Sequence, residues 1–180
     1  MKHSIVYQRQ KPLIDQYISD PECAMICDSA SVEGDHLDDP FHTKVKFNTQ
    51  DKTEIRIGLH KAVGGLHDAP NPGDILCAAL ATCTEATLRM IANRMSIALL
   101  ETKVEVEAFV DVRGTLMVDT EIPVHFQRMT LNLAIEVTDN KQHQVPMLIK
   151  MTKHCCIVYQ TLLRSIPIEF RHQEKFLINQ

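Results

Sequence analysis

The 22-residue segment from Asp74 to Met95 constrains the fold of this chain more than any other segment. It contains no glycine or proline, and it is dense in alanine, leucine and methionine, which favour the helix. Its middle, from Ile75 to Ala81, is apolar on every side. A helix without a polar face has to be covered on more than one side. We therefore expect this helix at the centre of the fold.

Alternating apolar and polar residues before and after this helix predict antiparallel β-structure. Residues 23–60 carry three such runs separated by turn-rich pieces, which indicates a meander. After the helix, residues 104–112 and 129–137 alternate very regularly. They predict an antiparallel pair of strands with one face toward water.

The order of the predicted elements indicates an α+β fold rather than a doubly wound parallel sheet, because strand pairs separate the helices. A second long helix is predicted over residues 145–163, followed by a short strand over residues 166–170. Residues 1–20 show helical spacing interrupted by Pro12, and we expect an N-terminal helical arm there. Residues 21–180 are predicted to form a single domain.

Composition excludes several classes of function. The net charge is only −4, so nothing favours a nucleic-acid partner. No 18 apolar residues run together, and the N-terminus lacks the apolar stretch of a signal peptide, so we expect no membrane partner and a cytoplasmic protein. Structural disulfides are rare in that compartment, which makes the six cysteines thiols, ligands or transient redox partners. Gly64-Gly65 is too short for a phosphate-binding loop, and no cofactor is expected.

Cys83 lies in the predicted central helix, and the residues alone leave two interpretations open. A passive core cysteine is the simpler one, since free cysteine packs as a small hydrophobic side chain. A reactive thiol is the other, because small neighbours let a ligand approach the sulfur closely. The neighbours three and four residues away are Ala79, Leu80, Ala86 and Thr87. Thr82, Thr84 and Glu85 indicate that this end of the helix is not wholly dry.

Cys155 and Cys156 lie in the predicted second helix. An apolar stripe there comprises Leu148, Met151, Cys155, Val158 and Leu162. This periodicity gives Cys155 the core-facing position and turns Cys156 roughly 100° aside. Two packing cysteines remain the simpler interpretation of this segment.

Three longer segments carry a resemblance to a known family. They are NPGDILCAALATCTEATLRMIANR, VEVEAFVDVRGTL and IPVHFQRMTLNLAIEV. Together they resemble the OsmC/Ohr family of small α+β thiol proteins. In that family one cysteine closes an alanine-rich helical run after an Asn-Pro loop, and a second one in the last long helix precedes a Thr-Leu pair. Cys83 and Cys156 match these two positions, and the resemblance covers roughly residues 23–170.

The resemblance implies a thiol-dependent peroxidase that reduces organic hydroperoxides. Cys83 would attack the peroxide as a thiolate and become a sulfenic acid, and Cys156 would resolve it to a disulfide. An external dithiol reductant would then restore both thiols. The resemblance also implies an OsmC-like fold of antiparallel sheets with two long central helices, in an intertwined homodimer with the thiol pair near the subunit interface.

A reactive Cys83 needs help to ionise. A free thiol has a pKa near 8.5, and apolar burial raises that pKa further. The field of the helix N-terminus fades within the first turn, and Cys83 lies well inside the helix. We therefore expect a nearby cation to stabilise the thiolate.

The family resemblance implies an arginine from the N-terminal strand region, held by a carboxylate just after the Asn-Pro loop. The matching position, ten residues before Cys83, is Gly73, so Asp74 is the candidate substitute, with helix capping as its alternative role. Only Arg9 and Arg56 precede Cys83, and Arg56 is the candidate cation, a solvated strand residue being its alternative. Arg113 is a further candidate, with a role in the turn as its alternative.

Two other classes of function compete with the peroxidase. The first is a non-catalytic OsmC-like protein that binds a small apolar ligand at the dimer interface and uses its thiols only structurally. The second is a metal-binding protein. Its candidate ligands are His143, His154, Cys155 and Cys156, with Cys23 and Cys27 elsewhere. Neither group has the paired spacing of structural zinc sites, so no metal is expected.

Overall fold

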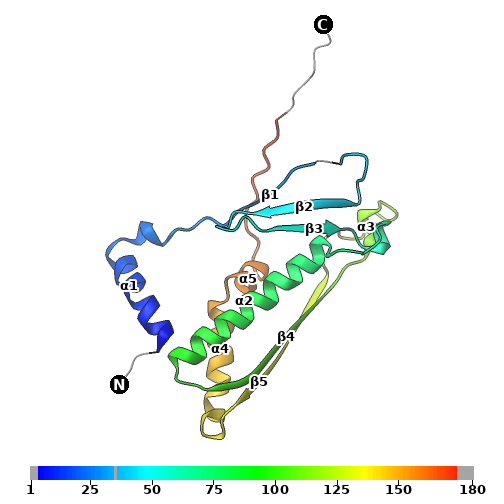
Figure 1. Cartoon of the computed structure of the whole chain (residues 1–180). Helices are drawn as coiled ribbons and strands as arrows, with labels where there is room; N and C mark the ends of the chain where they lie inside the picture. Colours follow the sequence, from blue (N-terminus) through cyan, green and yellow to red (C-terminus); the bar gives the residue numbers. More distant parts are fainter. Residues whose placement is uncertain (1–3, 35, 174–180) are drawn as a thin grey trace.

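A long central helix organises the fold. The computed structural model describes residues 4–34 and 36–173. The helix α2 (Pro72–Arg94) crosses the molecule, with a three-stranded sheet at its N-terminal end and a long two-stranded ribbon running alongside it (Figure 1). The remaining elements are α1 (Ile5–Ser19), η1 (Pro21–Ala24), β1 (Ala30–Val32), β2 (His42–Phe47), β3 (Glu54–Gly58), η2 (Lys61–Val63), β4 (Leu99–Phe109), α3 (Val112–Thr115), β5 (Arg128–Val137), η3 (Asp139–Gln144), α4 (Val145–Cys155) and α5 (Ile157–Leu162).

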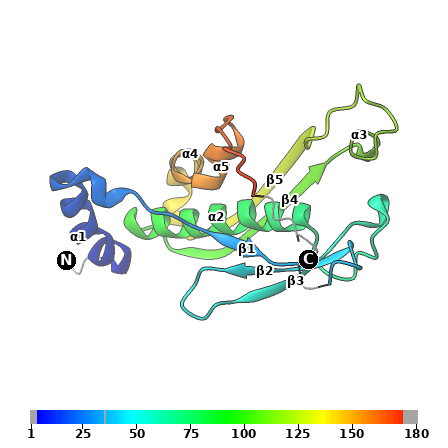
Figure 2. The ribbon, with the colours of Figure 1, turned by 90° about the horizontal axis from the view of Figure 1, so that it is seen from above.

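Two separate antiparallel sheets confirm the α+β prediction. The first sheet has the order β1-β2-β3, with Val45 opposite both Val32 and Ile55. The second pairs β4 with β5, with Val104 opposite Leu133. Viewed from above, the first sheet and the pair α4–α5 lie on opposite sides of α2 (Figure 2).

The ends of several predicted strands are wrong. The first strand begins only at Ala30: a 3-10 turn occupies Pro21–Ala24, and residues 25–29 form neither helix nor strand. The strand β4 ends at Phe109, and Asp111 caps the short helix α3 by accepting a hydrogen bond from the Arg113 amide. The predicted strand over residues 166–170 is absent from the structure, where this segment is exposed and unpaired with either sheet.

The helix α2 begins with a capping box. The Asn71 side chain accepts hydrogen bonds from the Gly73 and Asp74 amides, and the Asp74 carboxylate accepts one from the Asn71 amide. One face of α2 is buried against α4, around a core of Leu88, Ala92, Ile97 and Leu148. By length and hydropathy α2 also passes as a membrane span, a property shared by core helices of soluble proteins.

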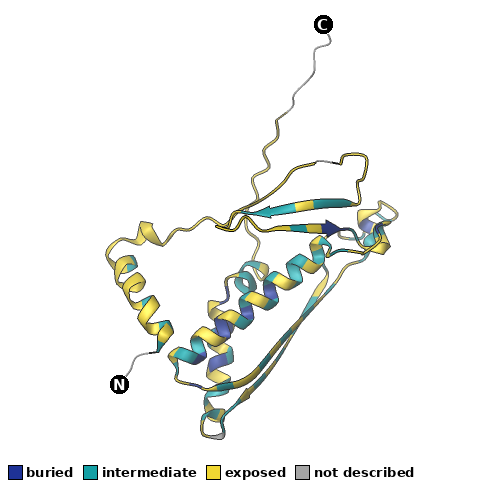
Figure 3. Ribbon diagram, in the orientation of Figure 1, coloured by how far each residue is buried: buried dark blue, intermediate teal, exposed yellow. Residues whose placement is uncertain are grey.

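Burial of α2 is confined to that one face, which differs from the expected cover on several sides. Ala78, Ala86 and Met90 are exposed in the single chain. Figure 3 shows buried residues on α2 and α4 and at the end of β3, whereas α1 is largely exposed and β2 is mostly intermediate. The strands β1, β2 and β3 lie chiefly beside one another rather than beside a helix of the same chain.

The predicted second helix is broken at Cys156. This residue has extended backbone angles, φ −72° and ψ 109°, between α4 and α5. The predicted orientation of the two neighbouring thiols is wrong: Cys156 is fully buried and Cys155 is exposed. The buried residues of α4 are Leu148 and Thr152, so its buried face does not follow the predicted stripe through Met151 and Cys155.

The N-terminal segment contains α1, within the predicted arm of residues 1–20. Ser4 caps it by accepting a hydrogen bond from the Tyr7 amide, and Pro12 lies inside it. The arm meets the C-terminal end of α2, where the Val6 amide donates to the Asn93 side chain at 3.3 Å. The described residues leave out 1–3 of the predicted arm and, in the predicted domain, residues 35 and 174–180. The division between arm and domain at residue 20 stays a prediction.

Candidate functional site

Two of the six thiols meet where α2 packs against α5. Cys83 lies in the middle of α2, and Cys156 lies at the break between α4 and α5. Thr84, the residue after Cys83, has its hydroxyl 3.6 Å from Cys156 Sγ, and each of the two thiols shifts the pKa of the other. The structure therefore brings the two predicted redox residues together.

The thiol of Cys156 is held in a buried, neutral environment. Its sulfur caps α5 by accepting a hydrogen bond from the Tyr159 amide at 3.5 Å, and the Thr84 hydroxyl lies 3.6 Å from it. Burial is the largest influence and raises the pKa of the Cys156 thiol. The neighbouring Cys83 raises it further, against the two hydrogen bonds, so Cys156 stays protonated at neutral pH.

The thiol of Cys83 behaves in the opposite way. Burial, again the largest single influence, raises its pKa, but four hydrogen-bond donors together lower the pKa below its ordinary value. These donors are the Val158 amide, the Cys156 thiol, the Thr87 hydroxyl and the Ile157 amide. Each bond favours the anionic sulfur. The pair therefore combines a Cys83 thiol of lowered pKa with a Cys156 thiol of raised pKa, as a nucleophile and its resolving partner require.

Arg56 and Asp74 are not brought to this thiol pair within the chain. The Arg56 guanidinium donates to Asp68 at 2.9 Å and is more than half exposed. Asp74 lies nine residues before Cys83 on the same helix, about 13.5 Å along its axis. Its carboxylate closes the capping box and lies 3.2 Å from His67 Nε2.

Gly73 occupies the position where the family resemblance calls for a carboxylate. A Cβ atom there would lie 2.9 Å from Asn71 Oδ1 and 3.1 Å from Phe126 Cζ. Both contacts are tighter than ordinary packing, so this position has little room for an acidic side chain. The close packing of Asn71 and Phe126 therefore agrees with a glycine, rather than a carboxylate, at position 73 of this chain.

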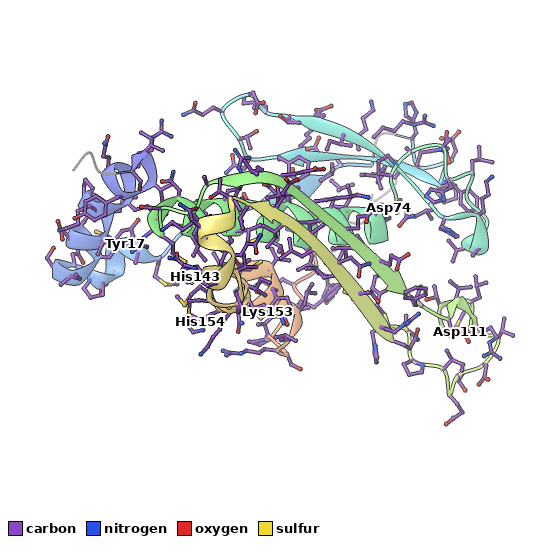
Figure 4. All side chains as sticks on the ribbon, turned by 90° about the horizontal axis from the view of Figure 1, so that it is seen from below. Tyr17, Asp74, Asp111, His143, Lys153 and His154 are labelled. Atoms are coloured by element: carbon purple, nitrogen blue, oxygen red, sulfur yellow. The ribbon has the colours of Figure 1, made fainter. Side chains whose placement is uncertain are left out.

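The other candidate residues lie elsewhere. Arg113 forms a paired contact with Asp111 at the end of β4, consistent with a role in the turn. Burial, followed by the charge of Asp74, raises the pKa of Cys77. Figure 4 shows Asp74 and Asp111 well separated from His143, Lys153 and His154.

The candidate metal ligands do not form a cluster. Cys23 and Cys27 are exposed, and the Cys23 thiol lies 2.8 Å from an Asp20 carboxylate oxygen. Across residues 4–34 and 36–173, no three His, Cys, Asp or Glu side chains are grouped closely enough to hold a metal ion.

A cavity of about 1110 Å³ reaches the thiol pair from the side of Cys156. Its walls come from α2, β5, α4 and α5, and are largely apolar, with Leu80, Leu131, Ile149 and Leu162 among the lining residues. Arg128, Lys153 and Arg164 add positive charge to the lining. A small or medium-sized organic molecule therefore has space next to the buried sulfur.

Sequence reasoning missed the hydrogen-bond donors around the two sulfurs. Thr84 and Thr87 were visible beside Cys83, and the spacing of four residues already placed Thr87 next to it on the helix surface. The amides of Ile157 and Val158 could not be found in this way. They are free to donate only because the helix restarts after Cys156.

Comparisons with known proteins bear on the family and the fold. A family model described as OsmC-like protein matches residues 65–171. The comparison with curated proteins gives no match. Among solved structures, the fold is similar to an OsmC-like protein of unknown function from Vibrio cholerae, at 12% identity over 76% of this chain and 94% of that chain, with a TM-score of 0.62.

Two further solved structures are similar. An organic hydroperoxide resistance protein OsmC from Legionella pneumophila is 18% identical over 77% of this chain and 90% of that chain, with a TM-score of 0.55. An OsmC-like protein from Mycoplasma pneumoniae is 16% identical over 77% of this chain and 87% of that chain, with a TM-score of 0.56. At these identities the likeness shows the fold alone.

Proposed function

Because this chain belongs to the family of OsmC-like proteins, we propose that it reduces organic hydroperoxides with Cys83 and Cys156. The observation that carries the proposal is the contact between a thiol of lowered pKa and a buried thiol of raised pKa. Solved structures of the same fold include proteins named for organic hydroperoxide resistance. The family and its α+β fold were both predicted from the sequence, and both are confirmed.

The reaction proceeds in three balanced steps. The Cys83 thiolate attacks one peroxide oxygen, the O–O bond breaks, and the leaving alkoxide takes up a proton to become an alcohol. The Cys83 sulfenic acid then reacts with the Cys156 thiol, forming a disulfide and releasing water. Finally an external dithiol reduces this disulfide by exchange and is itself oxidised to a disulfide.

The proposal includes a homodimer. The exposed apolar side of α2, with Ala78, Ala86 and Met90, supports a second copy as its cover. The first sheet, which packs chiefly within itself, offers a further surface. Arg56 lies on that sheet, where it pairs with Asp68. The roles of Arg56 and Asp74 in activating Cys83 stay a prediction.

We also place the protein in the cytoplasm. All six cysteines are free thiols in the structure. A reducing compartment keeps such thiols available between reaction cycles.

A peroxide-consumption assay tests the proposed function. It uses tert-butyl hydroperoxide and dithiothreitol with the wild type, Cys83→Ser and Cys77→Ser. Cys77 is the matched control, since it is a half-buried thiol six residues away on the same helix. We expect Cys83→Ser to abolish turnover and Cys77→Ser to retain it. Equal activity in all three proteins would remove Cys83 from the mechanism.

The cavity favours a second candidate function, the binding of a small apolar ligand without catalysis. Its volume of about 1110 Å³ and its leucine-rich walls suit such a ligand. Under this alternative the wild type consumes no peroxide above the Cys83→Ser background, while an apolar fluorescent probe binds both proteins equally.

A further inference from the structure

The cavity beside the thiol pair has a buried floor. Leu80, Thr84, Thr152 and Cys156 line it, and each of them is at most 4% exposed. The two threonine hydroxyls already have partners, since Thr152 donates to the Leu148 carbonyl at 2.8 Å and Thr84 lies 3.6 Å from Cys156 Sγ. The floor therefore favours the apolar part of a ligand.

The open side of the same cavity carries positive charge. Arg128 at the start of β5, Lys153 in α4 and Arg164 after α5 all line the cavity and are exposed. Among the described residues, no aspartate or glutamate lines it, although acidic residues outnumber basic ones in the chain by 23 to 19. The positive charge at the mouth is therefore not balanced within the cavity.

The three cations at the mouth also lack internal partners. None of them forms an ion pair with a carboxylate of residues 4–34 and 36–173, whereas Arg56, Arg113 and Arg171 each do. Arg128 stacks on the Phe109 ring at 4.0 Å from its centroid, a contact that uses the face of the guanidinium rather than the N–H groups along its edge. The mouth can therefore bind an external anion without first breaking an internal ion pair.

We propose that this cavity binds an amphipathic anion, which is an apolar chain or ring system that ends in one negatively charged group. The apolar part lies on the buried floor beside Cys156, and the anionic group lies at the mouth, where Lys153 and Arg164 bind it. The volume of about 1110 Å³ suffices, since cavities for drug-sized ligands measure roughly 300–1,000 Å³. This binding needs no reaction of either thiol, so it is a function separate from the proposed peroxide reduction.

Two fluorescent probes that share a ring system and differ in charge test the proposal. One is 8-anilinonaphthalene-1-sulfonate, and the other is N-phenyl-1-naphthylamine, which lacks the sulfonate group. Fluorescence titration gives the dissociation constant of each probe for the wild type and for Lys153→Gln/Arg164→Gln. We expect this variant to bind the sulfonate probe roughly 3- to 10-fold more weakly, because it loses two exposed ion pairs. Its affinity for the neutral probe should stay within about 2-fold of the wild type, because the apolar floor is unchanged.

A second double variant controls for the overall charge of the protein. Lys150→Gln/Arg171→Gln removes the same two charges from exposed positions that do not line the cavity. We expect this control to bind both probes as the wild type does. Added salt should weaken binding of the sulfonate probe to the wild type more than binding of the neutral probe.

Competition extends the test to simple aliphatic ligands. Decanoate and 1-decanol share one chain and differ in the charged group, and each is titrated against the bound neutral probe. We expect the ratio of their displacing concentrations to shift in favour of decanol by roughly 3- to 10-fold in Lys153→Gln/Arg164→Gln.

Three outcomes would overturn the inference. The first is a Lys153→Gln/Arg164→Gln protein that binds the sulfonate probe as tightly as the wild type. The second is an equal loss in both double variants, which would assign the effect to general surface charge. The third is no binding of either probe to the wild type, which would mean that a second copy of the chain fills the cavity. Cys83→Ser should bind both probes as the wild type does, so this inference and the proposed function can fail independently.

Discussion

The junction of α2 with α4 and α5 and the three-stranded sheet handle charge in opposite ways. At the junction, Leu88, Leu148, Thr152 and Cys156 are almost fully buried, and neutral donors surround the Cys83 sulfur. In the sheet region, His42 lies between the carboxylates of Asp39 and Asp68, at 2.7 and 2.9 Å, in contact with solvent.

This difference shows in which of the two regions the protein can shift the pKa of a reactive group. An ion pair in contact with water contributes little to stability, because the solvent screens the attraction between its two charges. A sulfur in a buried junction responds strongly to each donor, since water does not compete for it. The thiols at the junction are therefore the better candidates for catalysis, and the polar groups of the sheet are the poorer ones.

Truncation of the core should produce the largest change in stability. Leu88 is fully buried, whereas Leu100, on β4, is 60% exposed. We expect Leu88→Ala to lower the free energy of unfolding by about 2–5 kcal/mol and Leu100→Ala by less than about 1 kcal/mol. Urea unfolding followed by circular dichroism measures both. Equal losses would mean that the junction is no better packed than the ribbon surface.

The two neighbouring cysteines should differ strongly in reactivity in the folded protein. Cys155 is exposed and Cys156 fully buried, so alkylation of Cys156 requires local opening of the junction. An opening cost of about 3 kcal/mol slows alkylation by a factor of roughly 100. Pulsed labelling with iodoacetamide and fragment-ion analysis of the peptide 154–164 compares the two sites. In urea the two rates should converge, and a similar rate at both sites without urea would contradict the burial of Cys156.

Two glycines test how tightly the sheet region is built. A methyl group at Gly65 would overlap the backbone carbonyl of Leu59, whereas at Gly34 it would meet the end of the Leu37 side chain, which is 86% exposed and can move. We expect Gly65→Ala to cost about 1–3 kcal/mol and Gly34→Ala to stay within about 0.5 kcal/mol of the wild type. Thermal unfolding of both variants measures this. Equal and small effects would show that the loop after β3 is loosely held.

His42 should give the smallest effect, visible as a pH dependence. Its hydrogen bonds to Asp68 and then to Asp39 raise its pKa above the ordinary 6.5. The stabilisation from the protonated ring is therefore fully present below pH 6.5 and is lost as the pH rises through the raised pKa. The difference in melting temperature between the wild type and His42→Gln should be larger at about pH 6 than at about pH 9. A difference in melting temperature that does not change over this pH range would contradict the hydrogen bonds of His42 to Asp39 and Asp68.

The sequence predicted those parts of the fold whose patterns are local. The helix α2, the meander and the β4–β5 pair follow from uninterrupted periodicity and capping residues such as Asn71 and Pro72. Failures occurred where tertiary contacts override the pattern. Cys156 breaks a regular helical stripe, and residues 166–170 alternate like a strand but pair with neither sheet.

The site was predictable in part for a related reason. Family resemblance selected Cys83 and Cys156, whereas periodicity favoured Cys155 as the buried thiol, and the structure buries Cys156. The donors to Cys83 come from the restart of a helix 74 residues later in the chain, a feature without a local sequence signature. Arg56 and Asp74 were chosen from the family pattern, and within this chain Arg56 pairs with Asp68 and Asp74 caps α2.

The most direct test of the account is the identity of the bond formed by one equivalent of an organic hydroperoxide. Tryptic peptides of the oxidised protein are analysed by mass spectrometry in Cys77→Ser and in Cys77→Ser/Cys155→Ser, because peptide 154–164 holds both Cys155 and Cys156. The account predicts a Cys83–Cys156 disulfide in both proteins. A disulfide through Cys155 that disappears in the double variant, or oxidation of Cys83 with no disulfide at all, would contradict it.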